Sequence, residues 1–455
     1  MSGNLTAPGA SDVVVVGAGP SGLLLAGILA GAGARVTVLE SRGAPDPQIR
    51  ASTLHARAME IFDSHGVEFA PELPHSTHGH YGGLPVDLSR VESDRAGVRR
   101  CPQPELVRTL SGWAGRRGAR LLYGEHVESV HGQGQHRLVS TRTGRTFGAA
   151  LLVAADGQRS TVRALLGIHC EGAPATRVLV QADLLRSPVP GRRFERRGRY
   201  TVTAAPLSDE VTRLMIHDPR WPVGRPRTAE DLAAAWHAAT GEVLPAEPSW
   251  LRTFSDDTSV AHRLVEGRDV LCGDAAHPFI PIGGQALNTS LMDAEALGWR
   301  ILAHLEDGDP QGLLEYGEER AAWLDVLARR LRAQARLLFD TDEAATAHKA
   351  RVAERLNSDE AYRQKIADSL AGVDVCYPAA TGGIRRRLGP AQLREAGAAR
   401  RTTRVRRGSV TDGGTRVDAW IRPDHHWYPT APDEARQDWN DAVRPLDDHV
   451  AEAAR

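Results

Sequence analysis

Residues 17–22 of the sequence, GAGPSG, have the types and the spacing that bind the phosphates of a dinucleotide. In this GxGxxG pattern Gly17 permits a tight turn, Gly19 lets the backbone approach a pyrophosphate, and Gly22 lets a helix pack closely on a strand. The valines at 13–16 predict a strand that is buried on both faces and runs into the turn. The apolar segment after the turn predicts a helix, whose N-terminal N–H groups stabilise phosphates without a lysine.

Glu40 ends a second predicted strand, whose apolar residues are Val36 and Val38. It lies about 20 residues after the glycine turn, where a carboxylate accepts hydrogen bonds from both hydroxyls of an adenosine ribose. The turn and the acid together predict a site for the adenosine end of a dinucleotide, and they leave NAD and FAD open. A tight turn without a ligand is the alternative, but a chance match would not bring the strand, the helix and the terminal acid with it.

Two more predicted strands end near an aspartate, and ligands of such sheets bind at the carboxyl ends of the strands. The strand at 150–155 ends at Asp156, a site candidate whose alternative role is to cap the next helix. The strand at 269–272 leads to Asp274 and a glycine-rich loop. The helix predicted at 289–305 follows this loop, so a second helix N-terminus should face the same edge of the sheet.

Size and composition limit the classes of partner. The chain has 455 residues, 41% of them hydrophobic and 25% charged, with a formal net charge of -1. It is therefore large enough for two or three domains and gives no reason to expect a nucleic acid or an acidic membrane as partner. The N-terminus lacks a signal-peptide pattern, and no apolar run reaches the roughly 20 residues of a membrane span, so we expect a cytoplasmic protein. Its arginine, alanine and glycine usage indicates a GC-rich, for example actinobacterial, genome.

Neither the cysteines nor the clustered histidines predict a metal site. The four cysteines are scattered without CxxC spacing, which argues against zinc and redox dithiols. His75, His78 and His80 have no acidic or cysteine partner at ligand spacing, so they favour a solvated loop near a cavity mouth over a metal site.

Three motifs in order give the chain a family resemblance: GAGPSG with Glu40, AADGQRSTVR, and GDAAHPFIPIGGQALN. The sequence resembles class A flavoprotein monooxygenases of the para-hydroxybenzoate hydroxylase fold over roughly residues 10–335. RASTLHARAMEIF and LGWRI are similar to the branch that hydroxylates aromatic polyketides and rifamycin-type antibiotics. The resemblance implies FAD at the glycine turn, reduction by NADPH, and transfer of OH from a flavin C4a-hydroperoxide to an electron-rich ring. It implies no catalytic acid or base, because the cofactor carries the chemistry.

The resemblance also implies which residues bind FAD. The phosphates would lie against Gly17, Gly19, Pro20, Ser21 and Gly22. The adenosine end would meet Glu40, Ser41, Arg42 and Val127. The flavin and its ribityl chain would meet Arg50, Gln103, Asp274, Pro281, Gly283, Gly284, Gln285, Ala286, Leu287 and Asn288. The motif that serves both FAD and the passing NADPH would contribute Asp156 and Gly157. For His55, which also lies near the flavin, we expect a hydrogen-bonded structural role.

The implied fold is α/β: a Rossmann-like FAD-binding domain, a substrate domain with a mixed or antiparallel sheet, and a helical, shortened C-terminal region. The FAD-binding domain would comprise residues 1–175 and 261–335, with an insertion of the substrate domain near 74–103. The substrate-binding sheet domain would take residues 176–260. A helical region and a C-terminal tail would take residues 336–455.

Three features of the chain carry further expectations. Ala286 stands where the family usually has glycine. If that glycine serves a positive φ, alanine should cost about 1 kcal/mol or more, unless the loop has shifted to a conformation that accepts a Cβ. The Arg- and Glu-rich helical faces between 311 and 371 are expected to be solvated. The tail from 382 has too few apolar residues for a large core, and we expect a remnant of the family's thioredoxin-like domain or a mobile segment.

The favoured interpretation is an FAD- and NADPH-dependent hydroxylase, monomeric or homodimeric, of a bulky polyketide-like metabolite bound between the sheet domain and the flavin. The first alternative keeps FAD as a structural element in a non-redox cyclase of polyketide biosynthesis. The second alternative is a flavin-containing binding protein.

Overall fold

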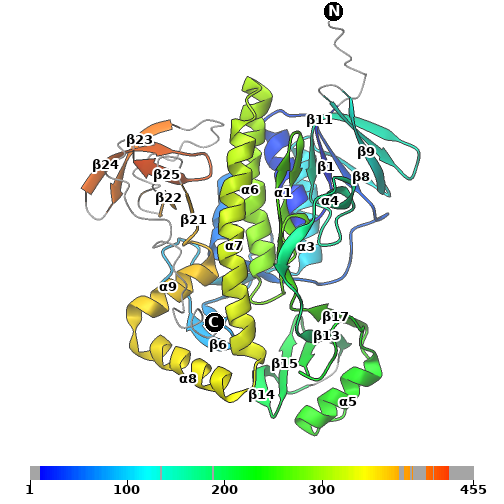
Figure 1. Cartoon of the computed structure of the whole chain (residues 1–455), viewed down its shortest axis with the longest axis vertical. Coiled ribbons are helices and arrows are strands. Elements are labelled where there is room, and N and C mark those ends of the chain that lie inside the picture. Colours follow the sequence, from blue (N-terminus) through cyan, green and yellow to red (C-terminus); the bar gives the residue numbers. More distant parts are fainter. Residues whose placement is uncertain are drawn as a thin grey trace, which may run out of the picture.

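The computed structural model describes residues 11–133, 136–186, 189–378, 384–389, 392, 406–412 and 415–429. Two long helices, α6 (Gln285–Asp307) and α7 (Gln311–Phe339), run side by side through the middle of the molecule (Figure 1). The sheet that contains the glycine turn lies on one side of this helix pair, and a C-terminal sheet lies on the other. Within the described ranges no helix has both the length and the apolar character to cross a bilayer.

The largest sheet has eight strands, and its five central strands are parallel. In order across the sheet these are β20 (Asp269–Leu271), β11 (Thr146–Ala154), β1 (Ser11–Val16), β2 (Val36–Glu40) and β8 (Arg120–Tyr123). Antiparallel strands add β19 (Val265–Glu266), β10 (His136–Thr141) and β9 (Val127–Gln133). Because the central strands share one direction, the segments that carry the glycine turn, Glu40, Asp156 and Asp274 all leave the sheet at one edge.

Helix α1 (Pro20–Gly31) is buried nearly all round, as its leucine-rich sequence predicts. It packs between α6 and α3 (Gln103–Arg116). Gly27 makes the second contact possible, since a Cβ there would lie 1.9 Å from the ring of Trp113. The other elements of this half are α2 (Ala56–His65), α4 (Thr161–Leu165), β3 (Thr53–His55), β4 (His75–Ser76), β5 (His78–Tyr81), β6 (Leu84–Asp87) and β7 (Val98–Arg100).

The second domain is an antiparallel sheet of five strands in the order β14-β15-β16-β13-β17. Its strands are β13 (Val178–Leu185), β14 (Arg192–Arg197), β15 (Tyr200–Pro206), β16 (Val211–His217) and β17 (Trp250–Ser255). Helix α5 (Ala229–Thr240) covers one face, against which Val180, Ala182 and Leu184 are buried. The alternate residues of β13 point to the other face, where Leu179 joins the core of the first domain. A strand pair, β12 (Cys170–Ala173) with β18 (Thr258–Ala261), links the two domains.

The C-terminal region contains α8 (Glu343–Ser358), α9 (Glu360–Ala371) and an antiparallel sheet of five strands. The strands are β21 (Cys376–Pro378), β22 (Ile384–Arg387), β23 (Arg406–Asp412), β24 (Thr415–Ile421) and β25 (His426–Pro429). The region is thus not only helical, and its small core consists of Leu388, Val410, Ala419, Ile421 and Trp427. The expectation of a mobile segment falls on 390–405 and 430–455, which lie outside the described residues apart from residue 392.

One expectation about the helical region is wrong. Glu319, Arg320 and Arg330 of α7 are 0 to 7% exposed, although their segment was expected to present solvated charged faces. Their partners come from remote parts of the chain, for example Tyr377 for Arg320 and Asp374 for Arg330. Helical periodicity alone does not reveal such partners, so it misassigned these charges to the surface.

Candidate functional site

The glycine turn after β1 has the geometry that its sequence predicts. Gly17 has a φ of 107°, and a Cβ there would lie 2.3 Å from the carbonyl oxygen of Ala155. A Cβ on Gly22 would lie 2.2 Å from the carbonyl oxygen of Gly17, so both positions require glycine. A Cβ on Gly19 would have no neighbour within 4 Å, and no side chain caps the N-terminus of α1. The turn therefore leaves open space in front of unpaired N–H groups.

Glu40 lies at the end of β2 and is 8% exposed. Its Oε2 accepts a hydrogen bond from the N–H of Ala18 at 3.0 Å, which ties the acid to the glycine turn. Its Oε1 accepts from the N–H of Arg42 at 2.9 Å, with the Ser41 hydroxyl and the Arg42 guanidinium each at 3.3 Å. The carboxylate is thus held next to the turn, where the ribose of a dinucleotide is expected.

Asp156 fulfils the alternative role considered for it, because it caps the segment that enters α4. It accepts hydrogen bonds from the Ser160 hydroxyl at 2.5 Å and from the N–H of Val162 at 3.1 Å. Burial raises the pKa of this carboxyl above its ordinary value. Arg163 from the same helix donates to the carbonyl oxygen of Ala275 at 2.8 Å and so joins this motif to the turn after β20.

The turn after β20 is a short 3-10 helix, Gly273–Ala275, and it contains Asp274. The Asp274 side chain is solvent-accessible, yet protein atoms surround it so closely that desolvation raises its pKa. The hydroxyl of Ser290, at 3.4 Å, is a distant hydrogen-bond donor to it. A Cβ on Gly273 would lie 2.6 Å from the hydroxyl of Ser21, so this turn directly touches the first turn of α1.

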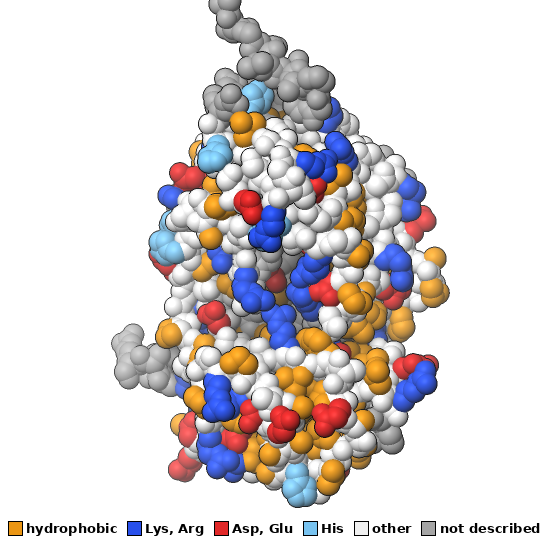
Figure 2. Space-filling view, turned by 90° about the vertical axis from the view of Figure 1, so that its right-hand side faces the viewer, with side chains coloured by type: hydrophobic (Ala, Val, Ile, Leu, Met, Phe, Trp, Pro, Cys, Tyr) orange, Lys and Arg blue, Asp and Glu red, His pale blue; other side chains and the backbone are white. Residues whose placement is uncertain are grey.

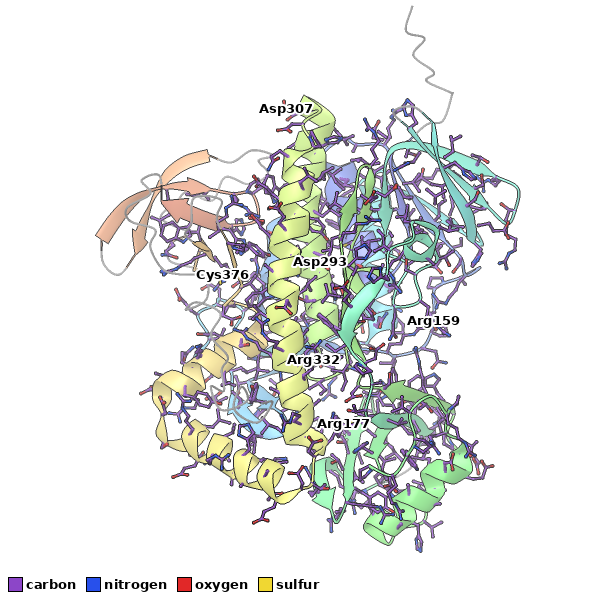
Figure 3. The ribbon with its side chains drawn as sticks, viewed as in Figure 1. Arg159, Arg177, Asp293, Asp307, Arg332 and Cys376 are labelled. Atoms are coloured by element: carbon purple, nitrogen blue, oxygen red, sulfur yellow. The ribbon has the colours of Figure 1, made fainter. Side chains whose placement is uncertain are left out.

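Asp293, which Figure 3 labels in the middle of the helix pair, belongs to α6 and holds the same turn in place. It accepts hydrogen bonds from the N–H of Gly273 at 2.9 Å, from Nε2 of His277 at 2.5 Å and from Nε of Arg320 at 2.6 Å. Burial by itself would raise the pKa of Asp293, but Arg320 and His277 outweigh it and keep the pKa below its ordinary value. No sequence motif pointed to Asp293 or Arg320, which lie 20 and 47 residues beyond the glycine that the aspartate fixes.

The glycine-rich loop ends earlier than expected, since α6 begins at Gln285 and not at 289. Gly283 and Gly284 have φ values of 61° and 74°, and no side chain caps the helix N-terminus. Ala286 lies inside the first helical turn and is not among the residues with positive φ. The condition for strain at Ala286, a positive φ, is therefore not met, because the two preceding glycines take up the left-handed conformation.

Two side chains of the first turn of α6 bind protein atoms. Asn288 accepts a hydrogen bond from the N–H of His55 at 2.8 Å and donates to the carbonyl oxygen of Thr53 at 3.0 Å. Gln285 donates to the carbonyl oxygen of Leu370 at 3.0 Å. The Nε2–H of His55 donates to the carbonyl oxygen of Gly283 at 2.8 Å, so His55 has the expected hydrogen bond. These side chains fix the loop. The N–H groups of Gln285 and Asn288 have backbone partners, so those of Ala286 and Leu287 remain for a ligand.

The other predicted contacts are spread around this edge. Arg50 is 40% exposed and pairs with Asp46 at 2.5 Å. Gln103 begins α3, and Val127 begins β9 with 3% exposure. Figure 2 shows a hollow between the upper and lower parts of the molecule, with basic side chains gathered around it. Among the described residues no group of three or more His, Cys, Asp or Glu side chains could hold a metal ion.

The residues present fit FAD. Two helix N-termini without a capping side chain supply N–H groups for anionic parts of the cofactor. At the first of them, a Cβ on Gly19 would have no neighbour within 4 Å, so the space in front of α1 is open. Glu40 and Asp274 lie at the same sheet edge and would accept hydrogen bonds from ribose and ribityl hydroxyls. The assignment of individual residues to parts of FAD stays a prediction.

Comparison with known proteins identifies residues 10–330 as an FAD binding domain. A rifampicin monooxygenase of Streptomyces venezuelae is 32% identical over 390 residues, which cover 82% of this chain and 80% of that protein. A 12-dehydrotetracycline 5-monooxygenase/anhydrotetracycline 6-monooxygenase of Streptomyces rimosus is 34% identical over 397 residues, covering 81% and 78%. The solved structure of the Diels-Alderase PyrE3 of the pyrroindomycin pathway has a TM-score of 0.78 at 26% identity and covers 95% and 98%.

The domain match spans more than half of the chain, and both sequence relatives are monooxygenases of at least 30% identity. The order of the three motifs, which contact one another at Gly17 with Ala155 and at Ser21 with Gly273, agrees with that match. The chain belongs to the FAD binding domain family and, within it, to the class A FAD-dependent monooxygenases of the aromatic polyketide and rifamycin hydroxylase branch.

Proposed function

We propose that this monooxygenase uses NADPH as reductant and hydroxylates a bulky, polyketide-like metabolite that binds between the substrate sheet and FAD. The observation that carries the proposal is the meeting of the three motifs at one sheet edge, where Asp274 is accessible but unpaired with any arginine or lysine among the described residues. The names of two relatives, a rifampicin and an anhydrotetracycline monooxygenase, support the class of substrate.

FAD would lie with its phosphates at the N-terminus of α1, its adenosine ribose at Glu40, its ribityl chain at Asp274 and its ring at the N-terminus of α6. When bound, it would supply the electron transfer and the activation of oxygen. The chain's own contribution is electrostatic: the N–H groups and the dipole of α6 stabilise negative charge that develops beside them, without proton transfer. Asp293 and His55 keep these elements in position through Gly273 and Gly283.

The face of the substrate sheet that meets the first domain carries both apolar and polar side chains. Leu179 and Met215 on its inner face are buried in the core of that domain, and Phe254 packs against it. Gln181 lies between them on β13, and its Oε1 is buried without a hydrogen-bond partner. A ligand hydroxyl or amide N–H would satisfy this acceptor, since an unpaired buried oxygen is costly. Gln181 would therefore give a bound substrate one polar anchor at this face.

The test measures NADPH oxidation and oxygen uptake by FAD-loaded enzyme with rifampicin and anhydrotetracycline as candidate substrates. We expect NADPH and oxygen to be consumed together, and the product to be heavier by one oxygen atom. A non-redox cyclase is the second candidate, because the Diels-Alderase PyrE3 has this fold over 95% of the chain. Conversion of a polyene substrate without consumption of NADPH or oxygen would replace the first proposal by the second.

Glu40→Ala tests the adenosine end of the FAD site. The variant loses charged hydrogen bonds worth about 1.5–3 kcal/mol, so FAD affinity should fall roughly ten- to hundredfold in a fluorescence titration. Glu128→Ala is the control, because Glu128 is an exposed acid on β9 that pairs with Arg142. FAD affinity equal to that of the control would remove Glu40 from the site.

A further inference from the structure

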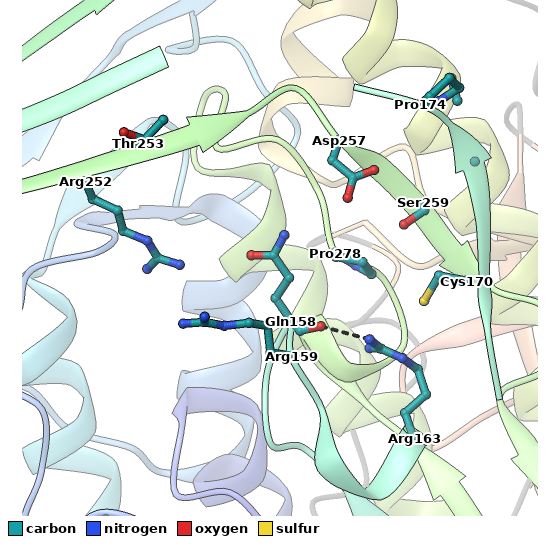
Figure 4. A pocket seen from close by; sticks show the side chains of 12 residues that line it. Gln158, Arg159, Arg163, Cys170, Pro174, Arg252, Thr253, Asp257, Ser259 and Pro278 are labelled. Carbon is teal, nitrogen blue, oxygen red and sulfur yellow. Dashed lines mark hydrogen bonds between the residues drawn. The ribbon is translucent and has the colours of Figure 1, made fainter. Parts of the chain in front are cut away.

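Residues 273–285, called the flavin segment below, run from the turn after β20 to the first residue of α6 and carry Asp274 and the glycine-rich loop. Pro278 in the middle of the segment lines a cavity between the two domains (Figure 4). The two ends of the segment are linked by hydrogen bonds to residues beyond 330, where the match to the FAD binding domain ends. The C-terminal region therefore reaches the segment on which the flavin is expected to lie.

The beginning of the flavin segment is held through a chain of buried side chains. Asp293 accepts hydrogen bonds from the N–H of Gly273 and from Nε2 of His277. Its second oxygen accepts from Nε of Arg320, and Nη1 of Arg320 donates to the hydroxyl of Tyr377 in β21 at 3.0 Å. All four side chains of this chain are buried. The position of Gly273 thus depends on a hydroxyl of the C-terminal sheet.

The Tyr377 hydroxyl is an acceptor that Arg320 needs. Nε of Arg320 is used by Asp293, and Nη2 donates at 3.3 Å to the carbonyl and hydroxyl oxygens of Thr289. Without the hydroxyl, Nη1 of this fully buried guanidinium would lose its partner, and an unpaired buried donor is costly. The guanidinium would then turn or admit water, and its bond to Asp293 would weaken.

The end of the flavin segment is held by α9. Gln285 donates from Nε2 to the carbonyl oxygen of Leu370 at 3.0 Å, and both residues are buried. Arg330 of α7 donates to the hydroxyl of Ser369 at 2.9 Å, so the last turn of α9 is itself fixed. Residues 370–377 therefore act on both ends of the flavin segment.

We propose that residues 370–377 are a positioning element of the FAD site, which acts through Arg320 and Gln285 on the segment that carries Asp274. The proposal rests on the placement of the ribityl chain and the flavin ring given under the proposed function. Hydrogen bonds weaken steeply when distance and angle change, so donors and acceptors for FAD must be held in place before it binds. If either end of the segment is released, binding has to order it first, and affinity falls.

The test is a fluorescence titration of apo protein with FAD, in wild type, Tyr377→Phe, Gln285→Met and the double variant. Tyr377→Phe removes only the hydroxyl, and Gln285→Met removes the amide donor at similar volume. Each single variant should weaken FAD about five- to tenfold, and the double variant should weaken it more than either. Tyr200→Phe is the matched control, because it also removes a buried tyrosine hydroxyl that is bonded to an arginine, in this case Arg199 of the substrate domain.

Urea denaturation of the same apo proteins separates positioning from stability. A variant that is only less stable stays almost fully folded without urea, so its FAD affinity would equal that of wild type. Weaker FAD binding by both single variants, with Tyr200→Phe equal to wild type and an altered visible spectrum of the bound flavin, supports the positioning element. FAD affinities of both single variants equal to that of the control overturn it.

Asp274→Ala keeps this failure distinct from failure of the proposed function. If Asp274→Ala loses FAD affinity while Tyr377→Phe and Gln285→Met keep it, the positioning element is overturned and the placement of FAD stands. If Asp274→Ala binds FAD as tightly as wild type, the placement is wrong, and the positioning element is overturned with it. NADPH oxidation with candidate substrates is measured separately, so the activity is judged independently of both.

Discussion

Two groups of arginine lie on opposite sides of the α6–α7 pair and differ in their partners. On the C-terminal side, Arg300, Arg385 and Arg422 converge on Glu319 of α7. Arg300 lies 2.6 Å from Oε2 of this glutamate, and Arg422 lies 2.9 Å from both of its oxygens. Burial by itself would raise the pKa of Glu319, but the three guanidinium groups outweigh it and lower the pKa. Each of the three arginines thus has an acidic partner inside the protein.

On the other side, Arg159 and Arg252 line a cavity of about 630 Å³ between the two domains (Figure 4). Figure 3 shows Arg159 across the helix pair from Cys376 of the C-terminal sheet. No described acid pairs with either of them. The contrast teaches that arginine in this chain has two kinds of surroundings. Paired charges join remote segments, because breaking a pair leaves an uncompensated ion. Arg159 and Arg252 at the sheet edge have no acidic partner among the described residues, so their charges are balanced by solvent or by a ligand.

Two aspartates show the same contrast over a short distance. Asp293 has three donors and a lowered pKa, whereas Asp274 has one distant donor and a raised pKa that results mainly from desolvation. The paired aspartate also connects the two sides, because Arg320 bonds both Asp293 and the hydroxyl of Tyr377 in β21. The C-terminal sheet therefore supports the turn that carries Asp274.

The largest effect is expected from Glu319→Gln, which breaks the paired side. Three buried guanidinium groups lose their common counter-charge, so the free energy of unfolding should fall by about 3–5 kcal/mol in urea denaturation. Glu128→Gln, which removes an exposed pair, is the control and should cost less than about 1 kcal/mol. Similar losses in the two variants would show that the buried network does not hold the helix pair to the C-terminal sheet.

Asp274→Ala tests the aspartate that has no basic partner. In contrast to Glu319→Gln, it should weaken FAD binding and leave the free energy of unfolding unchanged or higher. The raised pKa means that the folded protein disfavours the charged form, so at neutral pH the Asp274 carboxylate opposes folding and its removal should not lower stability. Loss of its hydrogen bond to the cofactor should weaken FAD binding roughly ten- to hundredfold and yield largely apo protein that is still folded. Loss of fold together with FAD would make Asp274 a structural cap.

The parts of this contrast that were predicted from the sequence are local. Val13–Val16, the glycine turn and Glu40 lie within 30 residues, and a buried strand, a φ of 107° and a strand-end acid follow from residue type and spacing. The substrate sheet was equally predictable, because residues alternate between the two faces along β13, as Val180 and Gln181 do. Such patterns need no knowledge of a distant partner.

The unpredicted parts depend on pairs that are far apart in the sequence. Arg422 reaches Glu319 across 103 residues, and Arg320 reaches Tyr377 across 57. From the sequence, a paired arginine on a helix and a solvated one look alike, so the charges of α7 were misassigned. Ala286 shows a second limit, since the start of α6 at Gln285 decided its conformation and the motif did not.

His55 makes the stability of the fold depend on pH. It is 3% exposed, and burial lowers its pKa from 6.5 to about 4. Between these values the unfolded chain binds a proton that the folded protein does not, so stability falls as the pH drops below 6.5. Protonation would also place a hydrogen on Nδ1, which is buried without a partner. At pH 5 the cost is about 2 kcal/mol.

The His55→Gln variant keeps an amide N–H for the carbonyl oxygen of Gly283 but cannot titrate. Its free energy of unfolding should therefore fall by about 2 kcal/mol less than that of wild type between pH 7 and pH 5, measured in urea. An identical pH dependence in the two proteins would mean that His55 opens to solvent before the chain unfolds. The acid sensitivity would then belong to other buried histidines, of which His80 and His425 also have pKa values lowered to about 4 by burial.

The smallest effect is expected from Ala286→Gly, and it separates backbone geometry from bulk at the flavin end. Because Ala286 has a helical conformation after Gly283 and Gly284, the variant should keep the loop and lose at most about 1 kcal/mol of stability through helix propensity. FAD should stay bound, while the missing methyl group gives a moving flavin more room beside the N-terminus of α6. We expect faster bleaching of the flavin absorbance by NADPH in stopped-flow, in the variant relative to wild type. Equal rates would show that the methyl group does not hinder the flavin. Reduction that is triggered by substrate in wild type would support a hydroxylase whose active site lies at the sheet edge that carries Asp274.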